Sequence, residues 1–173
     1  MTILTTPRLR LTPLEDADVG PLTAILREPE VARWWPGYDE GRVRDELRTG
    51  EDGGEYVTVF AVREAGRLLG VVQACEVLNP DYRHAGIDVA LGLAGQGRGL
   101  GREAIEAVVR WLSGERGHHR LVIDPAADNS RAIRCYEAVG FRAVGVLRQY
   151  ERGADGRFHD ALLMELVKDD WRG

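Results

Sequence analysis

Apolar and polar positions follow short periodic blocks along the chain, and each block predicts a strand or a helix. Alternating apolar residues indicate a strand over Arg8–Leu14. Blocks rich in β-branched residues indicate strands over Tyr56–Arg63 and Leu68–Glu76, and Glu64–Arg67 between them has the glycine of a hairpin turn. Apolar residues at three- and four-residue intervals predict an amphipathic helix over Gly99–Leu112.

The same signals place the remaining elements and define the fold class. Helices are expected over Glu15–Arg27, Glu40–Arg48 and Asn129–Val139, and strands over Ala85–Leu93, Leu121–Asp124, Phe141–Tyr150 and Arg157–Val167. The order is then β-α-α-β-β-β-α-β-α-β-β. No linker or repeat interrupts it, so we expect residues 1–173 to form one α/β domain with a mixed sheet.

Composition and charge narrow the function classes. The chain has 173 residues, two cysteines and a net charge of -5. A domain of this size needs no disulfide or metal to fold, and two cysteines suit a reducing cytoplasm. No apolar run is long enough to cross a membrane, and Arg8 and Arg10 interrupt the only N-terminal stretch that resembles a signal peptide. The negative charge argues against nucleic acid as a partner and is compatible with a small cationic substrate.

A glycine-rich segment, Gln96-Gly97-Arg98-Gly99-Leu100-Gly101, stands between a predicted strand and the longest predicted helix. The first N–H groups of a helix have no intrahelical partner and attract anions, and glycines let phosphate oxygens approach the backbone. The segment therefore predicts a phosphate cradle. The alternative is a strand-to-helix turn that binds nothing.

Two nucleotide-binding motifs are less consistent with the segment. A P-loop is excluded because no Gly-Lys-Ser/Thr follows the glycines. Residues 99–104 do match a dinucleotide-binding glycine pattern, and Asp124 stands where a ribose-binding acid is expected. However, the pattern follows a meander of strands, and too few residues remain after it for a doubly wound sheet.

The segment that begins at Asn129 combines capping signals with a candidate functional tyrosine. Asn129 can cap a helix and Gly140 can end it. The apolar face of this helix contains Ala132, Cys135, Tyr136 and Val139. By local physics alone, Tyr136 is equally well explained as a core aromatic.

Taken together, Gln96-x-x-Gly99-x-Gly101 and Asn129-x-x-Ala132-x-x-x-Tyr136-x-x-x-Gly140-Phe141 resemble the GNAT superfamily of N-acetyltransferases. The flanking hairpin, central strand and final strand pair fit the same family over nearly the whole chain. The resemblance implies a single domain with a splayed central strand pair and acetyl-CoA as the acetyl donor, without a metal. Many relatives pair through their last strands, so it also implies a homodimer.

The resemblance also implies where acetyl-CoA binds. The glycine segment would hold the pyrophosphate, the strand before it would pair with the pantetheine arm, Asn129 would reach the pantetheine amides, and Tyr136 would lie beside the sulfur. The implied contact residues are Val89, Ala90, Leu91, Gln96, Gly97, Arg98, Gly99, Leu100, Gly101, Arg102, Asn129, Ala132 and Tyr136.

Transfer to an amine requires a neutral amine, a stabilised oxyanion and a protonated leaving thiolate. We expect Asp88 to be the base or amine anchor, directly or through water, and Tyr136 to be the acid. The backbone N–H of Val89 or Ala90 is expected to stabilise the oxyanion. The alternative for Asp88 is a solvent-facing strand residue in an alternating pattern.

Within the superfamily, several segments look like those of aminoglycoside 6′-N-acetyltransferases. They are Arg33-Trp34-Trp35, Gly86-Ile87-Asp88, Asp124-Pro125 and Arg131–Glu137. The resemblance implies that Asp88 takes the 6′-amine, that Asp124 holds a second ammonium, and that Trp34 or Trp35 lines the sugar cleft. The connection Glu76–Gly86 is shorter than in that group, and Glu76 and Asp81 are expected to replace part of its charge. The tryptophans are equally compatible with an ordinary core.

Two other functions remain open. Residues 152–163 resemble the end of enzymes that acetylate protein N-termini, which makes a protein N-terminus or a small metabolite amine the alternative acceptor. A GNAT-like domain that binds acyl-CoA as a sensor is the third hypothesis. A sensor needs neither a base nor an acid, so Asp88 and Tyr136 together favour an enzyme.

Overall fold

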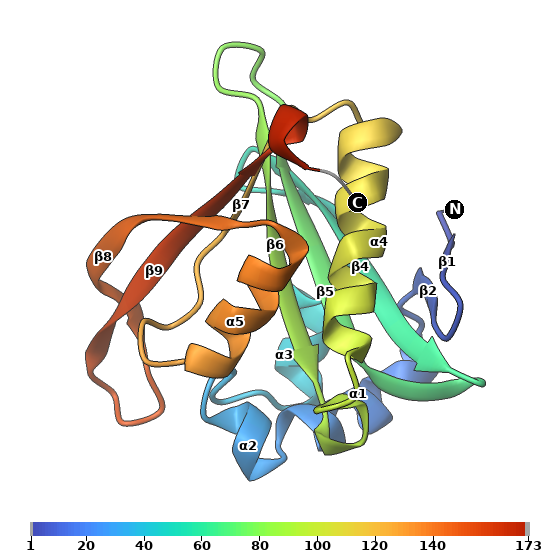
Figure 1. Cartoon of the computed structure of the whole chain (residues 1–173). Helices are drawn as coiled ribbons and strands as arrows, with labels where there is room; N and C mark the ends of the chain where they lie inside the picture. Colours follow the sequence, from blue (N-terminus) through green and yellow to red (C-terminus); the bar gives the residue numbers. More distant parts are fainter. Residues whose placement is uncertain (1, 172–173) are drawn as a thin grey trace.

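The computed structural model describes residues 2–171, and the strands of this part of the chain form one mixed sheet. The strand order is β1-β2-β4-β5-β6-β7-β9-β8, with β3 paired to β4. Figure 1 shows this sheet with its helices. The strands are β1 (Leu4–Thr5), β2 (Arg10–Pro13), β3 (Gly50–Asp52), β4 (Glu55–Glu64), β5 (Arg67–Val77), β6 (His84–Leu91), β7 (Arg120–Ile123), β8 (Arg142–Arg152) and β9 (Phe158–Val167).

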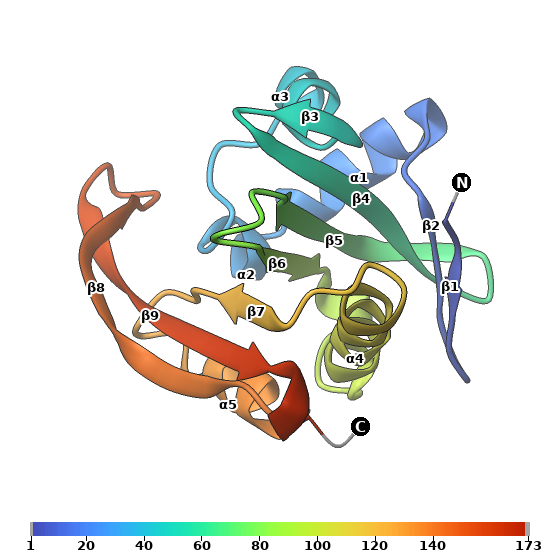
Figure 2. The ribbon, with the colours of Figure 1, turned by 90° about the horizontal axis from the view of Figure 1, so that it is seen from above.

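Helices cover both faces of the sheet, as the view in Figure 2 shows. The helices are α1 (Val19–Leu26), α2 (Pro29–Ala32), α3 (Glu40–Glu46), α4 (Leu100–Gly114) and α5 (Ser130–Val139), with single 3-10 turns at Asp16–Asp18, Leu93–Gly95 and Lys168–Asp170. One core joins the sheet to α4 and α5, and a second core joins it to α1 and α3. The two cores make the α/β layering expected from the sequence.

The predicted elements are present, with differences near the N-terminus. The helix expected over Glu15–Arg27 divides into a 3-10 turn and α1, because the Asp18 carboxylate accepts a hydrogen bond from the Glu15 N–H at 3.0 Å and closes a separate first turn. The same carboxylate pairs with Arg63 at 2.6 Å. The short elements β1, β3 and α2 were not predicted, because two to four residues show no periodicity.

The predicted hairpin and meander are confirmed. In the turn between β4 and β5, Ala65 and Gly66 both have positive φ angles, 46° and 85°. Two such residues in succession match the twist of the flanking strands. Strands β4, β5 and β6 pair antiparallel, and Asp88 on β6 lies opposite Gln73 on β5.

A gap in the ladder between β6 and β7 creates the splayed strand pair. These parallel strands pair only at Ala85 with Leu121 and at Gly86 with Val122. Beyond Gly86, β6 continues to Leu91 without β7 beside it, so this edge of its backbone is open to another chain or ligand.

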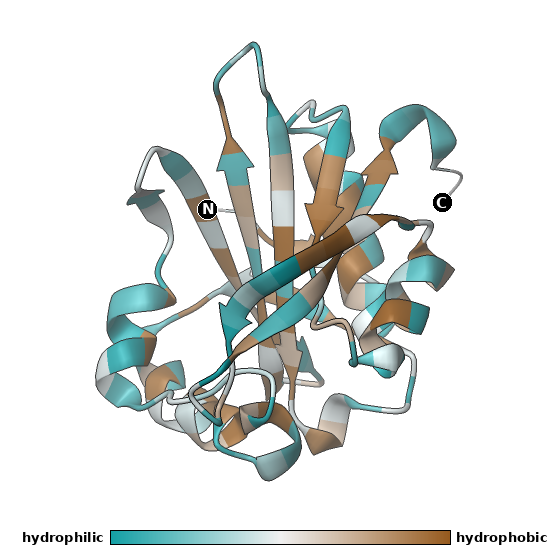
Figure 3. Cartoon of the chain, turned by 90° about the vertical axis from the view of Figure 1, so that its left-hand side faces the viewer, coloured by the Kyte–Doolittle hydropathy of each residue, from teal (hydrophilic) through white to brown (hydrophobic). Residues whose placement is uncertain are grey.

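The C-terminal elements complete the sheet. Asn129 caps α5, because its side chain accepts a hydrogen bond from the Ala132 N–H at 3.2 Å, and Gly140 follows the helix with a φ of 120°. The β8–β9 hairpin then extends across one side of the molecule, and its outer end is mainly hydrophilic (Figure 3). In the described residues, no helix combines the length and the apolar character needed to cross a membrane.

Candidate active site

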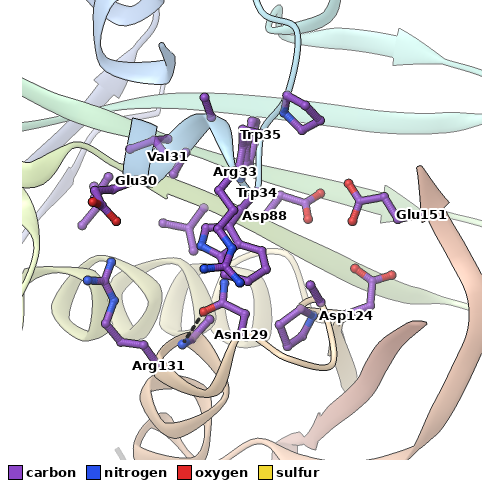
Figure 4. A pocket seen from close by; sticks show the side chains of 18 of the residues that line it. Glu30, Val31, Arg33, Trp34, Trp35, Asp88, Asp124, Asn129, Arg131 and Glu151 are labelled. Atoms are coloured by element: carbon purple, nitrogen blue, oxygen red, sulfur yellow. Dashed lines mark hydrogen bonds between the residues drawn. The ribbon is translucent and has the colours of Figure 1, made fainter. Parts of the chain in front are cut away.

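The opening between β6 and β7 continues into a cleft of about 1590 Å³. Its walls come from segments far apart in the sequence: the α2–α3 connection, β6, the glycine segment with the start of α4, the β7–α5 connection, and the β8–β9 hairpin. Figure 4 shows side chains from several of these walls converging on the same space. The predicted site residues are therefore expected to line this cleft.

The glycine segment forms one end of the cleft. Gly97 and Gly99 have φ angles of 71° and 76°, a left-handed conformation that favours glycine. Gly99 is the N-cap of α4, so the first N–H groups of a 15-residue helix are presented here. The Gln96 side chain donates a hydrogen bond to the Leu91 carbonyl at 2.6 Å, which ties the segment to the end of β6. This geometry fits an anion cradle.

The side chains of two residues in the glycine segment lie outside the cleft. The Arg98 guanidinium points to the β4–β5 hairpin, where both of its terminal nitrogens contact the Glu64 carboxylate at 2.7 Å. Arg8 also donates to the Arg98 carbonyl at 2.9 Å. Leu100 is fully buried in the core. Neither the Arg98 nor the Leu100 side chain lines the cleft.

Arginines gather on the same side of the cleft. Arg102 on α4 and Arg131 and Arg134 on α5 all line it. Arg102 also pairs with Glu106 at 2.7 Å. Sequence reasoning identified Arg102 and missed Arg131 and Arg134, because it assigned only the apolar face of their helix. These guanidiniums add positive charge next to the glycine segment.

The open edge of β6 runs from the glycine segment towards the middle of the cleft. Val89, Ala90 and Leu91 line the cleft, as do Asn129 and Ala132 across the gap. The Gln96 Oε1 atom is buried without a hydrogen-bond partner. An extended ligand that carries amide donors would fit between β6 and α5.

Tyr136 lies at the inner end of this gap. It lines the cleft, its side chain is 7% exposed, and its ring packs edge-on against Phe141. Burial raises the pKa of its hydroxyl above the usual value, and the nearby charges of Cys135, Asp88 and Asp124 raise it further. The hydroxyl therefore keeps its proton at neutral pH and can donate it.

Three carboxylates gather on the opposite side of the cleft, where Figure 4 shows Asp88, Asp124 and Glu151 facing one another. Asp88 lies inside the cleft, with its side chain exposed to the cleft space and surrounded by the cleft walls. This enclosure raises the pKa of Asp88 to about 7, and the charges of Asp124, Glu151 and Glu55 contribute. A carboxylate with this pKa can accept a proton near neutral pH.

Tyr150 and Glu151 were missed in the sequence, and an irregularity in β8 explains how they reach the cleft. The β8–β9 register shifts between Leu147 and Glu151. At this bulge Gln149 has a φ of 48°, and its N–H donates to the Asp160 carboxylate at 2.8 Å. Bulges redirect side chains, so strand alternation does not predict which face Tyr150 and Glu151 occupy.

The redirected side chains join the acidic group. A hydrogen bond from Tyr150 to Asp124 raises the pKa of Tyr150 to about 12, with burial and the Asp124 charge adding to the effect. Burial raises the pKa of Glu151, and the charge of Asp124 acts in the same direction. Carboxylates that repel each other in this way are stabilised by a cation placed between them.

The two predicted tryptophans form part of the wall next to Asp88. Both Trp34 and Trp35 are half-buried and line the cleft. Trp35 packs against the second core, with its ring centroid 5.7 Å from that of Tyr38. The cleft-lining and core interpretations of this pair are therefore compatible: both tryptophans line the cleft, and Trp35 also contributes to a core.

Glu76 does not belong to the cleft, and the prediction that it contacts the acceptor is wrong. Its side chain is completely buried near the C-terminal end of β5. There it contacts Arg116 at 3.0 Å and His118 at 2.7 Å. Burial lowers the pKa of His118, against the opposing effect of Glu76. Glu76 is thus a structural residue, whose partners lie 40 and 42 positions away.

No group of three or more His, Cys, Asp or Glu side chains in residues 2–171 is arranged to hold a metal ion. Trp34 and Tyr150 line the cleft with the three carboxylates, and aromatic and acidic groups together can bind a cation. The cleft therefore has a group of arginines on α4 and α5 and a group of carboxylates at β6, β8 and the end of β7.

Comparisons with known proteins agree with this geometry. The model of the acetyltransferase (GNAT) domain family matches residues 8–142. The aminoglycoside N(6′)-acetyltransferase type 1 of Klebsiella pneumoniae is 29% identical over 151 aligned positions, and the match covers 78% of this chain and 74% of that protein. The [ribosomal protein uS5]-alanine N-acetyltransferase of Escherichia coli (strain K12) is 24% identical over 179 aligned positions, and the match covers 97% of this chain and 92% of that protein.

Among solved structures, AAC(6′)-Ib in complex with paromomycin and acetyl-CoA superposes with a TM-score of 0.76. It is 26% identical to this chain, and the match covers 94% of this chain and 95% of that one.

Proposed function

The chain belongs to the GNAT acetyltransferase family, and from this premise we propose that it transfers the acetyl group of acetyl-CoA to the 6′-amine of an aminoglycoside. The observation that carries the proposal is the presence in one cleft of a group of arginines and a group of carboxylates. An anionic donor and a polycationic acceptor would each meet the complementary group, and the two would meet at Asp88 and Tyr136.

The group of arginines and the nearby start of α4 suit acetyl-CoA. The N–H groups at the start of α4 would bind its pyrophosphate, with Gly97 and Gly99 permitting close approach, and Arg102 or Arg131 would neutralise phosphate charge. The pantetheine arm would extend along the open edge of Val89–Leu91.

The group of carboxylates suits an acceptor with several ammonium groups. Asp88 would bind the reacting amine, while Asp124 and Glu151 would bind a second ammonium and relieve their mutual repulsion. Trp34 offers a flat apolar surface to a sugar ring. A neutral or singly charged acceptor would leave this group of carboxylates uncompensated.

The residues of the cleft then account for each proton. Acetyl-CoA supplies an activated thioester. Asp88, with a pKa of about 7, would take the proton from the acceptor ammonium and leave a neutral nucleophile. The N–H of Val89 or Ala90 would stabilise the oxyanion as the carbon–nitrogen bond forms. Tyr136 would give its proton to the departing sulfur as the carbon–sulfur bond breaks. The nitrogen of the new amide would release its remaining excess proton, which would pass through solvent to restore the Tyr136 hydroxyl, and Asp88 would release its own proton to solvent.

The experiment that tests the proposal is thiol release from acetyl-CoA in the presence of kanamycin A, with the product identified by mass spectrometry. Turnover that requires the drug, and that Asp88→Asn reduces by at least tenfold, supports the proposal. Glu137→Gln removes one charge from the exposed face of α5, outside the cleft, and is the matched control. Wild-type protein that releases no thiol with any aminoglycoside would refute the choice of acceptor.

A second candidate acceptor is a protein N-terminus. The E. coli uS5-alanine N-acetyltransferase matches nearly the whole of this chain, which favours this alternative. Thiol release with a peptide that begins with alanine, and none with kanamycin A, would establish it in place of the first.

A further inference from the structure

Arg33 crosses the mouth of the cleft and contacts both of its walls. It follows α2, and its guanidinium carbon lies 4.5 Å from the centroid of the Trp34 ring. One of its nitrogens lies 3.6 Å from the Asp128 carboxylate, in the β7–α5 connection on the other wall. Figure 4 shows Arg33 next to Trp34, between Asp88 and Asn129. All three contact residues line the cleft.

The surroundings of this guanidinium are those of a cation-binding site. An aromatic face and a carboxylate hold one positive charge from two directions. Moreover, the segment that carries Arg33 is anchored independently, because the Glu28 side chain before α2 accepts a hydrogen bond from the Leu93 N–H at 2.6 Å. The Trp34 N–H donates to the Val31 carbonyl at 2.9 Å and the Ser130 N–H donates to the Asp128 carbonyl at 3.0 Å, so the backbone on each side of the pair is held by hydrogen bonds that do not involve Arg33.

We propose that the Trp34 ring and the Asp128 carboxylate form a subsite for a distal ammonium group of the acceptor, and that Arg33 occupies this subsite until the acceptor displaces it. This inference rests on the function proposed above and adds a determinant of specificity. Arg33 acts as an internal competitor, which only an acceptor with at least two well-separated cations can replace while its reacting amine stays at Asp88.

The contacts of Arg33 are weak enough for such an exchange. The side chains of Arg33 and Asp128 are 64% and 71% exposed, so water screens their ion pair. An acceptor anchored at Asp88 presents its second ammonium at an effective concentration of order millimolar or higher. Together, an exposed ion pair and an exposed cation–π contact make competition by Arg33 worth about threefold to fivefold in KM.

The test compares two acceptors that share the same reacting group. Kanamycin A carries several amines, and methyl 6-amino-6-deoxy-glucopyranoside carries only one, on the same type of sugar. Arg33→Gln is expected to lower the KM for kanamycin A about threefold to fivefold and to leave the KM values for the single-amine sugar and acetyl-CoA unchanged. Adding Asp128→Asn to Arg33→Gln removes the carboxylate of the subsite and should abolish this gain.

Arg44→Gln is the matched control. Arg44 forms an exposed ion pair with Glu40 at 2.9 Å on α3 and does not line the cleft, so the same loss of charge should leave both acceptors unaffected. An unchanged KM for kanamycin A in Arg33→Gln, an equal change for both acceptors, or a change confined to acetyl-CoA would each overturn the inference.

The two proposals fail in different ways. Absence of acetylation of any aminoglycoside by the wild-type protein refutes the proposed function. In that case, calorimetric titration with kanamycin A decides the inference. Tighter binding of kanamycin A by Arg33→Gln than by wild type would support the cation subsite. Equal binding, or no binding by either protein, would overturn the inference too.

Discussion

Replacing Glu151 by glutamine should make the enzyme more active at low pH relative to its activity at high pH. The charge of Glu151 is one of those that raise the pKa of Asp88, after desolvation in the cleft and the charge of Asp124. Asp124 also accepts a hydrogen bond from Tyr150, so its replacement would disturb a second contact. Glu151→Gln keeps the size of the side chain and removes one negative charge.

The size of the effect follows from the pKa of about 7. With that pKa, about one tenth of Asp88 is deprotonated at pH 6 and about nine tenths at pH 8. Removing a like charge worth about 1 kcal/mol lowers a pKa by ~0.7. The deprotonated fraction at pH 6 then rises to about one third, so the ratio of kcat/KM at pH 6 to that at pH 8 increases about threefold.

The assay is kcat/KM for kanamycin A, measured from pH 5.5 to 9 by thiol release for wild type, Glu151→Gln and the control Glu137→Gln. The acceptor amine titrates identically with all three proteins, so a difference between profiles belongs to the protein. A Glu151→Gln profile that overlays the wild type, or that moves to higher pH, would refute the assignment of Asp88 as the base whose pKa Glu151 raises.

Three further substitutions probe separate parts of the structure. Tyr136→Phe should lower kcat by about 10- to 100-fold with little change in the KM for acetyl-CoA, because the hydroxyl acts only on the departing sulfur. A rise in the KM for acetyl-CoA with kcat unchanged would contradict this role. Gly99→Ala forces an alanine to a φ of 76°, so the KM for acetyl-CoA should rise several-fold while the KM for the acceptor stays constant. Glu76→Ala leaves Arg116 and His118 without their carboxylate and should reduce the free energy of unfolding by about 3 kcal/mol in urea titrations, with kinetic constants unchanged.

Periodicity was sufficient to predict the central part of the fold. The β-branched blocks in residues 56–76, with the glycine turn between them, predicted the hairpin β4–β5, and the helical spacing after Gly99 predicted α4, because each pattern spans many residues and faces a core. The splayed pair β6–β7 came from a family resemblance instead. No local pattern shows that two parallel strands pair at only two positions.

Side chains whose position depends on distant partners were harder to predict. Glu76 looked like a surface acid near the acceptor, but it is buried against Arg116 and His118, which follow an intervening strand and helix. Glu151 lay just past the strand expected over Phe141–Tyr150, but β8 continues to Arg152 and the bulge at Gln149 turns Glu151 into the cleft. The contact of Arg33 with Asp128 joins two loops 95 positions apart, and only the tertiary structure reveals it.

The most direct test of the central claim uses two aminoglycosides that differ in one group. Neomycin B carries an amine at the 6′ position, and paromomycin carries a hydroxyl there. The proposed reaction predicts thiol release and a singly acetylated product with neomycin B, and neither with paromomycin, which should instead bind as a competitive inhibitor. Equal acetylation of both drugs would contradict transfer to the 6′-amine.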